Sequence, residues 1–453
     1  MNYLRRCLMG SNLEDNLPPL CADPLISLPG TCLDQPAILH LNRSALSRGL
    51  LAMGATGTGK SAFLRACGKQ LRERLGRAYS MVVLEVKEDY SPALFRPGDR
   101  ILGQGADRGE SVRWNLFADL TDDGWEDEAI RLNCMEFTRQ LFADKKNQSQ
   151  QFFPDAAQLL LYVVLVHYIQ QARGSLLQRR KLNNAGLRAF FSQYDPEQYV
   201  ALMERCEDPG VVRMLLGASA DNPQALGVLG EEVLTVLSTF SDVFGEEGDF
   251  SIRRFVREKS GQALFLRFDP SYQETQRRVF SLLINLMFKE LLAWRSDPAG
   301  DLVFLCDELP SIGKVDLPSA LNLGRAKGLL CLAGLQSVEQ IYAIYGEHEG
   351  NTALAGFCNQ VLFAPNDPRT RRYIRNLFGE NRVEELILSP GGVHTIQRGG
   401  YVVEDSHLIS LGVGDCICSL SSSMSMAAGG AGSRAPFLFH MTMPHDLNGG
   451  SPT

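Results

Sequence analysis

The amino-acid sequence predicts an α/β fold in which a mostly parallel sheet is interrupted by an inserted all-α domain. Short, continuous apolar runs alternate with helical stretches toward both ends of the chain, a pattern typical of strands covered by helices on both faces. Between about residues 119 and 243 the sequence instead has repeated helical stretches and almost no β-branched runs. A chain of 453 residues is long enough for two or three domains, each with its own core.

Composition and charge are those of an ordinary globular protein, with 45% hydrophobic and 21% charged residues. The net charge of -7 argues against a basic surface that binds nucleic acid everywhere, although a local basic channel inside an assembly would not show in that sum. Eleven cysteines without a C-x-x-C pair indicate reduced thiols rather than a disulfide framework or a zinc site.

Hydropathy gives no sign of a membrane span or a secretory signal. The longest apolar run, LLLYVVLV at residues 159–166, is far shorter than the ~20 residues that cross a bilayer. No hydrophobic region follows the N-terminal MNYLRR. We therefore expect a cytoplasmic protein without a membrane span in this chain.

The first α/β part is expected to cover residues 1–118. Residues 34–54 alternate short apolar runs with Pro, Gly and Asn, and they lead into the buried strand RGLLAMG. After a helix comes a second strand, MVVLEV at residues 81–86, and then a third, DRILGQG at residues 99–105. This order is the βαβ pattern of a parallel sheet.

The loop between the first buried strand and its helix is GATGTGKS, which matches G-x-x-x-x-G-K-[ST]. Glycines at this spacing let successive backbone N–H groups turn inward around phosphate oxygens. The Lys60 side chain would reach the β- and γ-phosphates of a nucleotide, and the Ser61 hydroxyl would ligate Mg²⁺. Because strand, loop and helix stand in the required order, we expect ATP or GTP to be bound by Gly54, Ala55, Thr56, Gly57, Thr58, Gly59, Lys60 and Ser61.

The predicted all-α domain covers residues 119–243, after which the α/β pattern resumes at GDFSIRRF. Residues 244–440 are expected to form the second part of the nucleotide-binding domain. Four apolar runs in it predict strands separated by helices, namely QALFLRF, DLVFLCDE, GLLCLAGLQ and QVLFAPN. A flexible tail is expected at residues 441–453, and the Gly/Ser-rich SSSMSMAAGGAGSRAP predicts a loop or mobile segment.

Two adjacent acids end the apolar run of DLVFLCDE, at the C-terminal end of a strand, where α/β sheets place their ligands. Asp307 would hold Mg²⁺ through water beside Ser61. Glu308 would orient and deprotonate the attacking water. One acid would suffice for binding, so the pair indicates hydrolysis. The alternative, a strand that simply ends in two solvated carboxylates, is disfavoured by the phosphate-binding loop.

Two more residues are candidates for roles in hydrolysis. Gln336 follows the run GLLCLAGL, where the end of a neighbouring strand would present its amide to the γ-phosphate and report hydrolysis to moving parts. Arg325, in LGRAKG, would reach the γ-phosphate of a neighbouring subunit and stabilise transition-state charge, as arginine fingers do. The alternatives are a polar strand end for Gln336 and a surface arginine for Arg325.

With these motifs in place, the sequence resembles the type IV secretion coupling proteins, the TraD/TraG-type ATPases of conjugation, which are related to hexameric RecA-like DNA translocases. The resemblance covers most of residues 47–380, and DELPSIGKV followed by GRAKGL and GLQS is more specific than the phosphate loop alone. The matching stretches, in the family's order, are GATGTGKS, RWNLF, GDFSIRRF, LVFLCDELPSIGKV, LNLGRAKGLLCLAGLQSVEQI and LFAPNDPRTRRYIRNLFGE.

The resemblance implies a RecA-like P-loop domain with Walker A and Walker B motifs, assembled into a homohexameric ring with ATP at the subunit interfaces and a central channel for DNA. It implies that the helical domain faces the DNA-processing complex, and that the partners are the relaxosome and the proteins of the secretion channel. Carried over to matching positions, it assigns Lys60, Glu308, Gln336 and Arg325 to catalysis, and Ser61 and Asp307 to Mg²⁺.

The sequence departs from the family's pattern in two places. Most members begin with a transmembrane anchor, and none is expected in this chain, so a partner would recruit it peripherally to the inner membrane or it would act without an anchor. VVLEVKED, with Glu85 and Lys87, stands where the family carries an aspartate at a strand end. A basic cluster on one predicted helix favours a solvated face or intersubunit salt bridges over phosphate contacts, and its members are Arg369, Arg371, Arg372 and Arg375.

The favoured function is an ATP-driven motor that couples a relaxosome to a secretion channel and pumps single- or double-stranded DNA. One alternative is a docking receptor that recruits secreted proteins through its helical domain. Another is a soluble DNA-processing translocase that works outside secretion. A small-molecule kinase is disfavoured because it has no use for a helical insertion or an arginine acting in trans. The fold alone does not choose among the first three.

Overall fold

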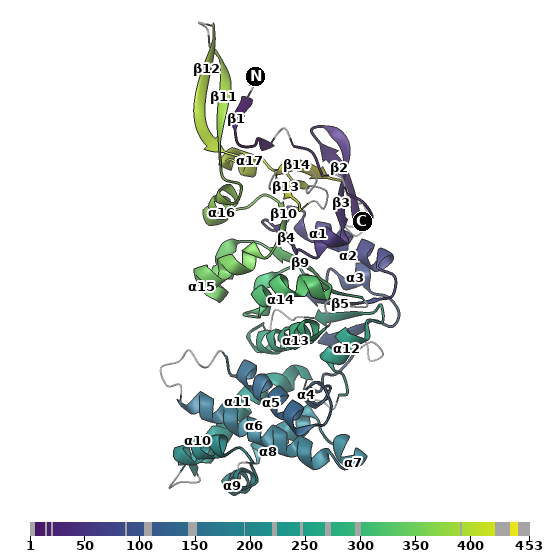
Figure 1. Ribbon diagram of the computed structural model, residues 1–453, viewed down its shortest axis with the longest axis vertical. Helices are drawn as coiled ribbons and strands as arrows, with labels where there is room; N and C mark the ends of the chain where they lie inside the picture. Colours follow the sequence, from purple (N-terminus) through teal and green to yellow (C-terminus); the bar gives the residue numbers. More distant parts are fainter. Residues whose placement is uncertain are drawn as a thin grey trace, which may run out of the picture. The chain divides into compact units, whose positions relative to one another are not determined.

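The computed structural model describes most of the chain and divides it into two compact units (Figure 1). Unit 1 consists of residues 1–97, 259–263 and 291–453, and unit 2 consists of residues 98–258 and 264–290. The described residues are 5–13, 16–19, 21–86, 88–103, 111–143, 152–193, 195–219, 224–244, 248–267, 273–294, 300–389, 392–421 and 435–442.

Five parallel strands form the middle of unit 1, and every residue in them is buried. Their order is β10-β4-β9-β8-β5. Helices that cover both faces of a parallel sheet bury every residue of its strands. This burial explains the continuous apolar runs in the sequence. The predicted mostly parallel sheet is confirmed. Its strands are β4 (Leu50–Met53), β5 (Tyr79–Glu85), β8 (Asp301–Cys306), β9 (Leu329–Leu335) and β10 (Asn359–Leu362).

Antiparallel strands extend this sheet beyond β10 in the order β13-β14-β2-β3. A separate three-stranded antiparallel sheet has the order β1-β11-β12. β14 and the β11–β12 hairpin were not predicted, because half-exposed strands mix polar and apolar residues. These strands are β1 (Arg5–Met9), β2 (Pro24–Cys32), β3 (Gln35–Asn42), β11 (Glu380–Ser389), β12 (Gly392–Tyr401), β13 (Asp415–Ser419) and β14 (Phe437–Met441).

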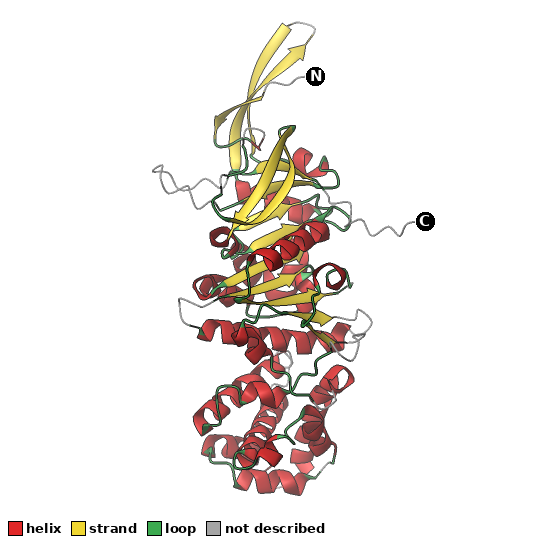
Figure 2. Ribbon diagram, turned by 90° about the vertical axis from the view of Figure 1, so that its right-hand side faces the viewer, coloured by secondary structure: helices red, strands yellow, loops and turns green. Residues whose placement is uncertain are grey.

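Helices pack against the strands of unit 1, shown in red and yellow in Figure 2. Helix α2 contacts β2, β4 and β9, and α14 contacts β9. The helices are α1 (Arg43–Leu46), α2 (Lys60–Arg74), α3 (Ser91–Leu94), α14 (Leu317–Gly324), α15 (Val338–Ala355), α16 (Pro368–Phe378) and α17 (Asp405–Ile409), with 3₁₀ turns η4 (Leu309–Ile312) and η5 (Arg325–Lys327).

Unit 2 contains a pair of parallel strands, β6 (Arg100–Gly103) and β7 (Ala263–Arg267), and a group of helices. Within residues 119–243, the described part of the chain is helical and has no strand, as the sequence predicts. The boundaries at residues 118, 243 and 440 stay predictions. The helices are α4 (Leu116–Leu120), α5 (Asp127–Leu141), α6 (Phe152–Ala172), α7 (Leu176–Arg179), α8 (Asn184–Ser192), α9 (Pro196–Glu204), α10 (Pro209–Ser219), α11 (Gln224–Phe244), α12 (Ile252–Glu258) and most of α13 (Gln273–Ala293).

Helix α6 lies at the centre of the helices of unit 2. It contacts α5, α7, α9, α10 and α11, and its residues from Leu160 to Leu165 are all buried. A helix surrounded by other helices must be apolar on all sides, which explains the run LLLYVVLV. Among the described helices, none combines the length and the apolarity needed to cross a bilayer.

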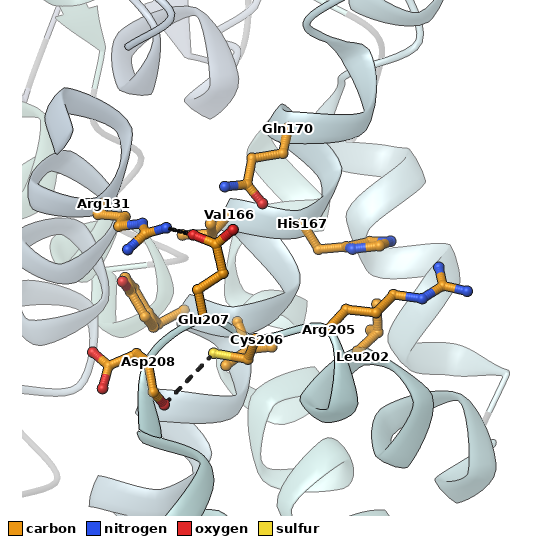
Figure 3. Close-up of a pocket in the computed structure, with 11 residues that line it drawn as sticks. Arg131, Val166, His167, Gln170, Leu202, Arg205, Cys206, Glu207 and Asp208 are labelled. Atoms are coloured by element: carbon orange, nitrogen blue, oxygen red, sulfur yellow. Dashed lines mark hydrogen bonds and ion pairs between the residues drawn. The ribbon is translucent and has the colours of Figure 1, made fainter. Parts of the chain in front are cut away.

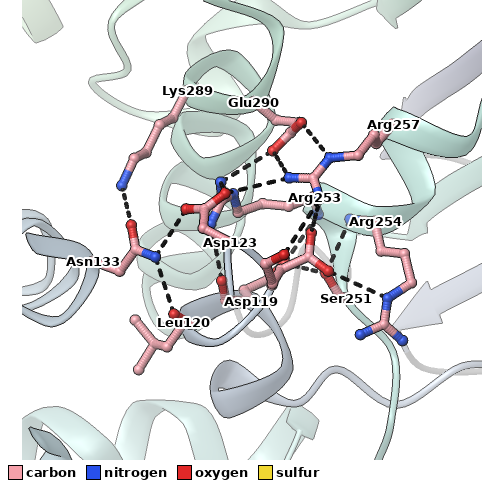
Figure 4. A network of polar contacts seen from close by, with 11 residues as sticks. Asp119, Leu120, Asp123, Asn133, Ser251, Arg253, Arg254, Arg257, Lys289 and Glu290 are labelled. Atoms are coloured by element: carbon pink, nitrogen blue, oxygen red, sulfur yellow. Dashed lines mark hydrogen bonds and ion pairs between the residues drawn. The ribbon is translucent and has the colours of Figure 1, made fainter. Parts of the chain in front are cut away.

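A buried aspartate joins the segment that leads into the helical insertion to the segment that follows it (Figure 4). Asp119, at the end of α4, accepts hydrogen bonds from the Trp114 Nε1 at 2.5 Å, the Ser251 Oγ at 2.6 Å and the Arg253 backbone N at 3.0 Å. Burial raises the pKa of Asp119, and the hydrogen bonds from Ser251 and Trp114 act in the opposite direction. These donors satisfy a carboxylate that would otherwise be costly to bury.

The Arg253 guanidinium is the cation of this network, and its side chain is 3% exposed. Its Nη2 lies 2.6 Å from the Asp123 Oδ1 and 3.1 Å from the Glu290 Oε2 of α13. Arg257 also pairs with Glu290, at 2.7 Å. The network therefore ties α4, α12 and α13 together at the base of the insertion.

We predict that Arg253→Ala lowers the free energy of unfolding of unit 2 by about 1–3 kcal/mol, because it removes a buried cation from Asp123 and Glu290 and leaves Glu290 with Arg257 alone. Arg254→Ala is the matched control, since this side chain is 53% exposed and pairs with Asp122. Its loss should cost less than about 1 kcal/mol. Urea unfolding followed by tryptophan fluorescence measures both effects, and equal losses in the two variants would contradict the assigned role of Arg253.

Candidate nucleotide-binding site

The loop of residues 54–61 follows β4 and is anchored by backbone hydrogen bonds to other parts of unit 1. The Gly54 N–H donates to the carbonyl of Leu335, at the end of β9, at 3.0 Å. The Ala55 N–H donates to the carbonyl of Ala364, just after β10, at 2.9 Å. The Thr58 carbonyl accepts from the Gly414 N–H at 3.0 Å. The loop is thus fixed before any ligand binds.

Glycine is required where the loop enters helix α2. Gly59 is the residue before the helix and has a φ of 116°, in the left-handed region that other residues rarely adopt. The N–H groups in the first turn of a helix lack intrahelical acceptors, and the helix dipole favours negative charge there. Because α2 is 15 residues long, its start is well suited to bind phosphate.

Lys60, Ser61 and Asp307 lie together in the structure, as the sequence predicts. Lys60 is 6% exposed, and its Nζ lies 3.2 Å from the Asp307 Oδ1 and 3.1 Å from the Asp307 carbonyl oxygen. The Ser61 Oγ donates to the Asp307 Oδ2 at 2.6 Å. A hydroxyl and a carboxylate in contact supply the oxygen ligands that Mg²⁺ prefers, so these residues fit the predicted ion.

Glu308 and Gln336 lie at the ends of the neighbouring strands β8 and β9, and they contact each other. The Gln336 Nε2 donates to the Glu308 Oε2 at 2.6 Å. The Gln336 Oε1 accepts from the Thr56 Oγ1, in the loop, at 3.3 Å. Gln336 therefore links the candidate base to the phosphate-binding loop, and a shift of either group would be passed to the other.

Close approach of β9 to the end of β8 requires glycine at position 334. A Cβ on Gly334 would lie 2.0 Å from the Asp307 carbonyl oxygen and 2.7 Å from its carbonyl carbon. Both neighbours are backbone atoms, which cannot move aside as a flexible side chain could. Glycine at position 334 therefore allows β9 to lie close to the Asp307 backbone, and a larger residue would displace Asp307.

Arg325 is not part of the cluster around Asp307. It lies in η5, before the N-terminal end of β9, whereas Gln336 follows the C-terminal end of the same strand. Seven strand residues separate the ends by about 20 Å. Arg325 is exposed, and no ion pair is found for it within the described part of the chain. This position suits contact with another molecule and not with the nucleotide of its own chain.

The structure also brings in two residues without a predicted role, Glu85 and Tyr90. Both are buried, with 0% and 2% exposure. Glu85 ends β5, beside Asp307, and its Oε1 accepts from the Tyr90 N–H at 2.9 Å. The only sequence signal was an acid at the end of the apolar run MVVLEV, and Lys87 lies outside the described residues.

The predicted arginine cluster lies on one helix, α16, and most of its members form ion pairs within the chain. Arg369 pairs with Glu339 at 2.9 Å, and Arg375 pairs with Asp405 at 2.8 Å. Arg371 lies 3.8 Å from Asp405. These partners are in accord with a salt-bridged, solvated face for three of the four arginines, and the exposed Arg372 is the fourth.

A second candidate site is a pocket among the helices of unit 2 (Figure 3). Arg131 and Glu207 form an ion pair at its edge. Burial, and then the charge of Arg205, lower the pKa of His167. The lining carries two arginines, Arg131 and Arg205, and two acids, Glu207 and Asp208, so its formal charges balance. The pocket therefore does not select a strongly charged ligand.

Comparisons with known proteins agree with this geometry. The strand, glycine-rich loop and helix, with two acids just after β8, define a P-loop nucleotide-binding fold of the α/β class. Residues 36–407 match the model of the type IV secretion-system coupling protein DNA-binding domain, and the chain belongs to this family. A sequence comparison with curated proteins gives no match.

Similar solved structures include the bacterial conjugative coupling protein TrwBdeltaN70 in an unbound form, with a TM-score of 0.68, 21% identity, and coverage of 97% of this chain and 94% of that chain. TrwB in complex with ADP and Mg²⁺ has a TM-score of 0.64 and 20% identity, covering 90% and 87% of the two chains. VirB4 of Thermoanaerobacter pseudethanolicus has a TM-score of 0.53 and 14% identity, covering 94% and 99%. At these identities the likeness establishes the fold alone, a TrwB-like fold with a mostly parallel sheet and many helices.

We predict that Gly334→Ala destabilises unit 1 by about 1–3 kcal/mol and weakens Mg²⁺-dependent nucleotide binding, because the added methyl displaces Asp307. Gly399→Ala is the control, since a Cβ there meets no atom within 4 Å. It should change stability by less than about 0.5 kcal/mol. Thermal unfolding and titration with a fluorescent ADP analogue measure the two effects, and normal binding by Gly334→Ala would contradict the constraint.

Proposed function

We propose that this protein is an ATP-hydrolysing coupling protein that recruits DNA in a relaxosome and pumps it toward a type IV secretion channel. The observation that carries the proposal is the cluster of Lys60, Ser61 and Asp307, with a second acid, Glu308, held by Gln336. Membership of the coupling-protein family supports the DNA-transfer role. TrwB was solved with ADP and Mg²⁺, with an ATP analogue and with a GTP analogue, which supports ATP or GTP with Mg²⁺ as the ligands here.

In the proposed mechanism, the backbone N–H groups of residues 56–61 bind the phosphates, since those of Gly54 and Ala55 anchor the loop to Leu335 and Ala364. Lys60 moves from Asp307 to the β- and γ-phosphates. Ser61 and Asp307 hold Mg²⁺, which neutralises charge on the phosphates when bound. Glu308 orients the attacking water and accepts its proton. Gln336 senses the γ-phosphate, and its bonds to Thr56 and Glu308 give it a route to report hydrolysis.

We propose that Arg325 acts in trans, as an arginine finger in a homohexameric ring. Its exposed position supports this, because β9, which is about 20 Å long, lies between Arg325 and Gln336. A head-to-tail ring would bring this surface to the nucleotide of the next subunit. The chain would then work in the cytoplasm or peripherally at the inner membrane, with the relaxosome and channel proteins as partners.

The second candidate is a docking receptor for secreted proteins, in which the ATPase fold serves as a platform. Exposed leucines on the helical unit favour it, since Leu176 and Leu177 of α7 are 77% and 73% exposed. The third candidate function for this fold is a soluble DNA translocase that works outside secretion.

We predict that single-stranded DNA stimulates ATP hydrolysis by the purified protein and that this stimulation falls steeply as salt rises, because DNA binding releases counterions. Lys60→Ala should abolish hydrolysis by removing phosphate binding. Glu308→Gln should retain nucleotide binding but lower turnover at least about 100-fold. Phosphate release across a salt series measures these effects. Binding of ATP without any response to DNA would favour the docking receptor.

A mixing experiment tests the role of Arg325. Lys60→Ala and Arg325→Ala should each be inactive alone, since a missing arginine finger costs about 1,000-fold or more. In mixed rings, about a quarter of the interfaces would pair an intact Lys60 with an intact Arg325. We therefore expect activity to reappear on mixing. No recovery in rings shown by native mass spectrometry to contain both variants would exclude action in trans.

A further inference from the structure

Tyr90 carries a buried hydroxyl next to the candidate metal-binding carboxylate. The residue is 2% exposed and lies between β5 and α3. Burial, and then the negative charge of Asp307, raise the pKa of Tyr90 well above its usual range. Its Oη lies within hydrogen-bonding reach of the Asp307 side chain, although the contact does not have the geometry of a well-formed hydrogen bond. A buried hydroxyl in a poorly formed hydrogen bond is unfavourable, so its position beside Asp307 needs an explanation.

Glu85 holds the backbone that carries this tyrosine. In the parallel pairing of β5 with β8, Leu84 lies opposite Cys306, so Glu85 and Asp307 follow each other on adjacent strands. One oxygen of Glu85 accepts from the Tyr90 N–H at 2.9 Å, the Ser91 N–H at 2.7 Å and the Ser91 Oγ at 2.9 Å. These bonds close the turn after β5 and direct Tyr90 toward the strand ends.

Both oxygens of Asp307 already have donors. The Oδ1 lies 3.2 Å from the Lys60 Nζ, and the Oδ2 accepts from the Ser61 Oγ. In the proposed function a nucleotide draws Lys60 to its phosphates, which removes the donor from Oδ1. Tyr90 is a buried, uncharged hydroxyl donor beside this carboxylate that can replace Lys60 at Oδ1.

We propose that Tyr90 is a positioning residue for the metal-binding carboxylate, with its hydroxyl donating to Asp307 once Lys60 has moved to the phosphates, and that Glu85 fixes Tyr90 in place. The inference rests on the proposed function and adds to it two residues that the family resemblance left without a role. Donors behind a metal-binding carboxylate fix its orientation, and their loss commonly lowers metal affinity about 10–100-fold.

The test compares Tyr90→Phe with Tyr345→Phe, using a fluorescent ADP analogue titrated with Mg²⁺ or with EDTA. Tyr90→Phe removes a hydroxyl that has only a poorly formed contact with Asp307. We therefore expect little change in unfolding stability, unchanged binding in EDTA and about 10–100-fold weaker Mg²⁺-dependent binding. Tyr345 is also buried, but its hydroxyl bonds to the backbone N and O of Val315, both at 3.1 Å. Its variant should lose stability and keep the Mg²⁺ dependence.

The outcomes separate this inference from the function on which it rests. If the wild-type protein binds the nucleotide with Mg²⁺ and Tyr90→Phe binds it equally well, the inference is wrong and the proposed function stands. If Tyr90→Phe loses stability and binds less well with and without Mg²⁺, Tyr90 is only structural and the inference is also wrong. If the wild-type protein binds no nucleotide, the proposed function fails, and the inference fails with it.

Discussion

The contact of Asp307 with Lys60 and Ser61 is the interaction on which the candidate site depends. It joins a loop after β4 to the end of β8, two strands separated in the sheet by β9. The parallel pairing of these strands places all three carboxyl ends at one edge, which is where α/β sheets bind ligands. The sheet must therefore form in its correct register before lysine, hydroxyl and carboxylate can meet.

The polar groups of the site are bonded to one another because they gather where the C-terminal ends of the parallel strands meet. Asp307 supplies both oxygens to the loop, Gln336 bridges Thr56 and Glu308, and Glu85 satisfies the turn that carries Tyr90. Partly buried charges need such partners, since an unpaired charge in this environment is unfavourable. A phosphate group competes directly for Lys60, so binding of a nucleotide would rearrange the hydrogen bonds of Asp307.

Sequence reasoning identified the parts of the structure that depend on local pattern. The continuous apolar runs predicted the parallel strands, and the order of strand, loop and helix predicted the position of Lys60. Repeated helical stretches with almost no strand-like runs predicted the helical insertion. The β11–β12 hairpin was missed because its strands are half-exposed and pair only with each other and with β1. Glu85 and the Arg253 network were missed because their partners lie far away in the sequence or depend on the exact turn after a strand.

The most direct test of this account is a structure of the protein with a non-hydrolysable ATP analogue and Mg²⁺, in which the distance from the Lys60 Nζ to the Asp307 carboxylate is measured. The account predicts that Lys60 leaves Asp307 for the β- and γ-phosphates, while Asp307 and Ser61 face the ion. A nucleotide bound elsewhere, or one bound in the loop with the contact between Lys60 and Asp307 unchanged from 3.2 Å, would contradict it.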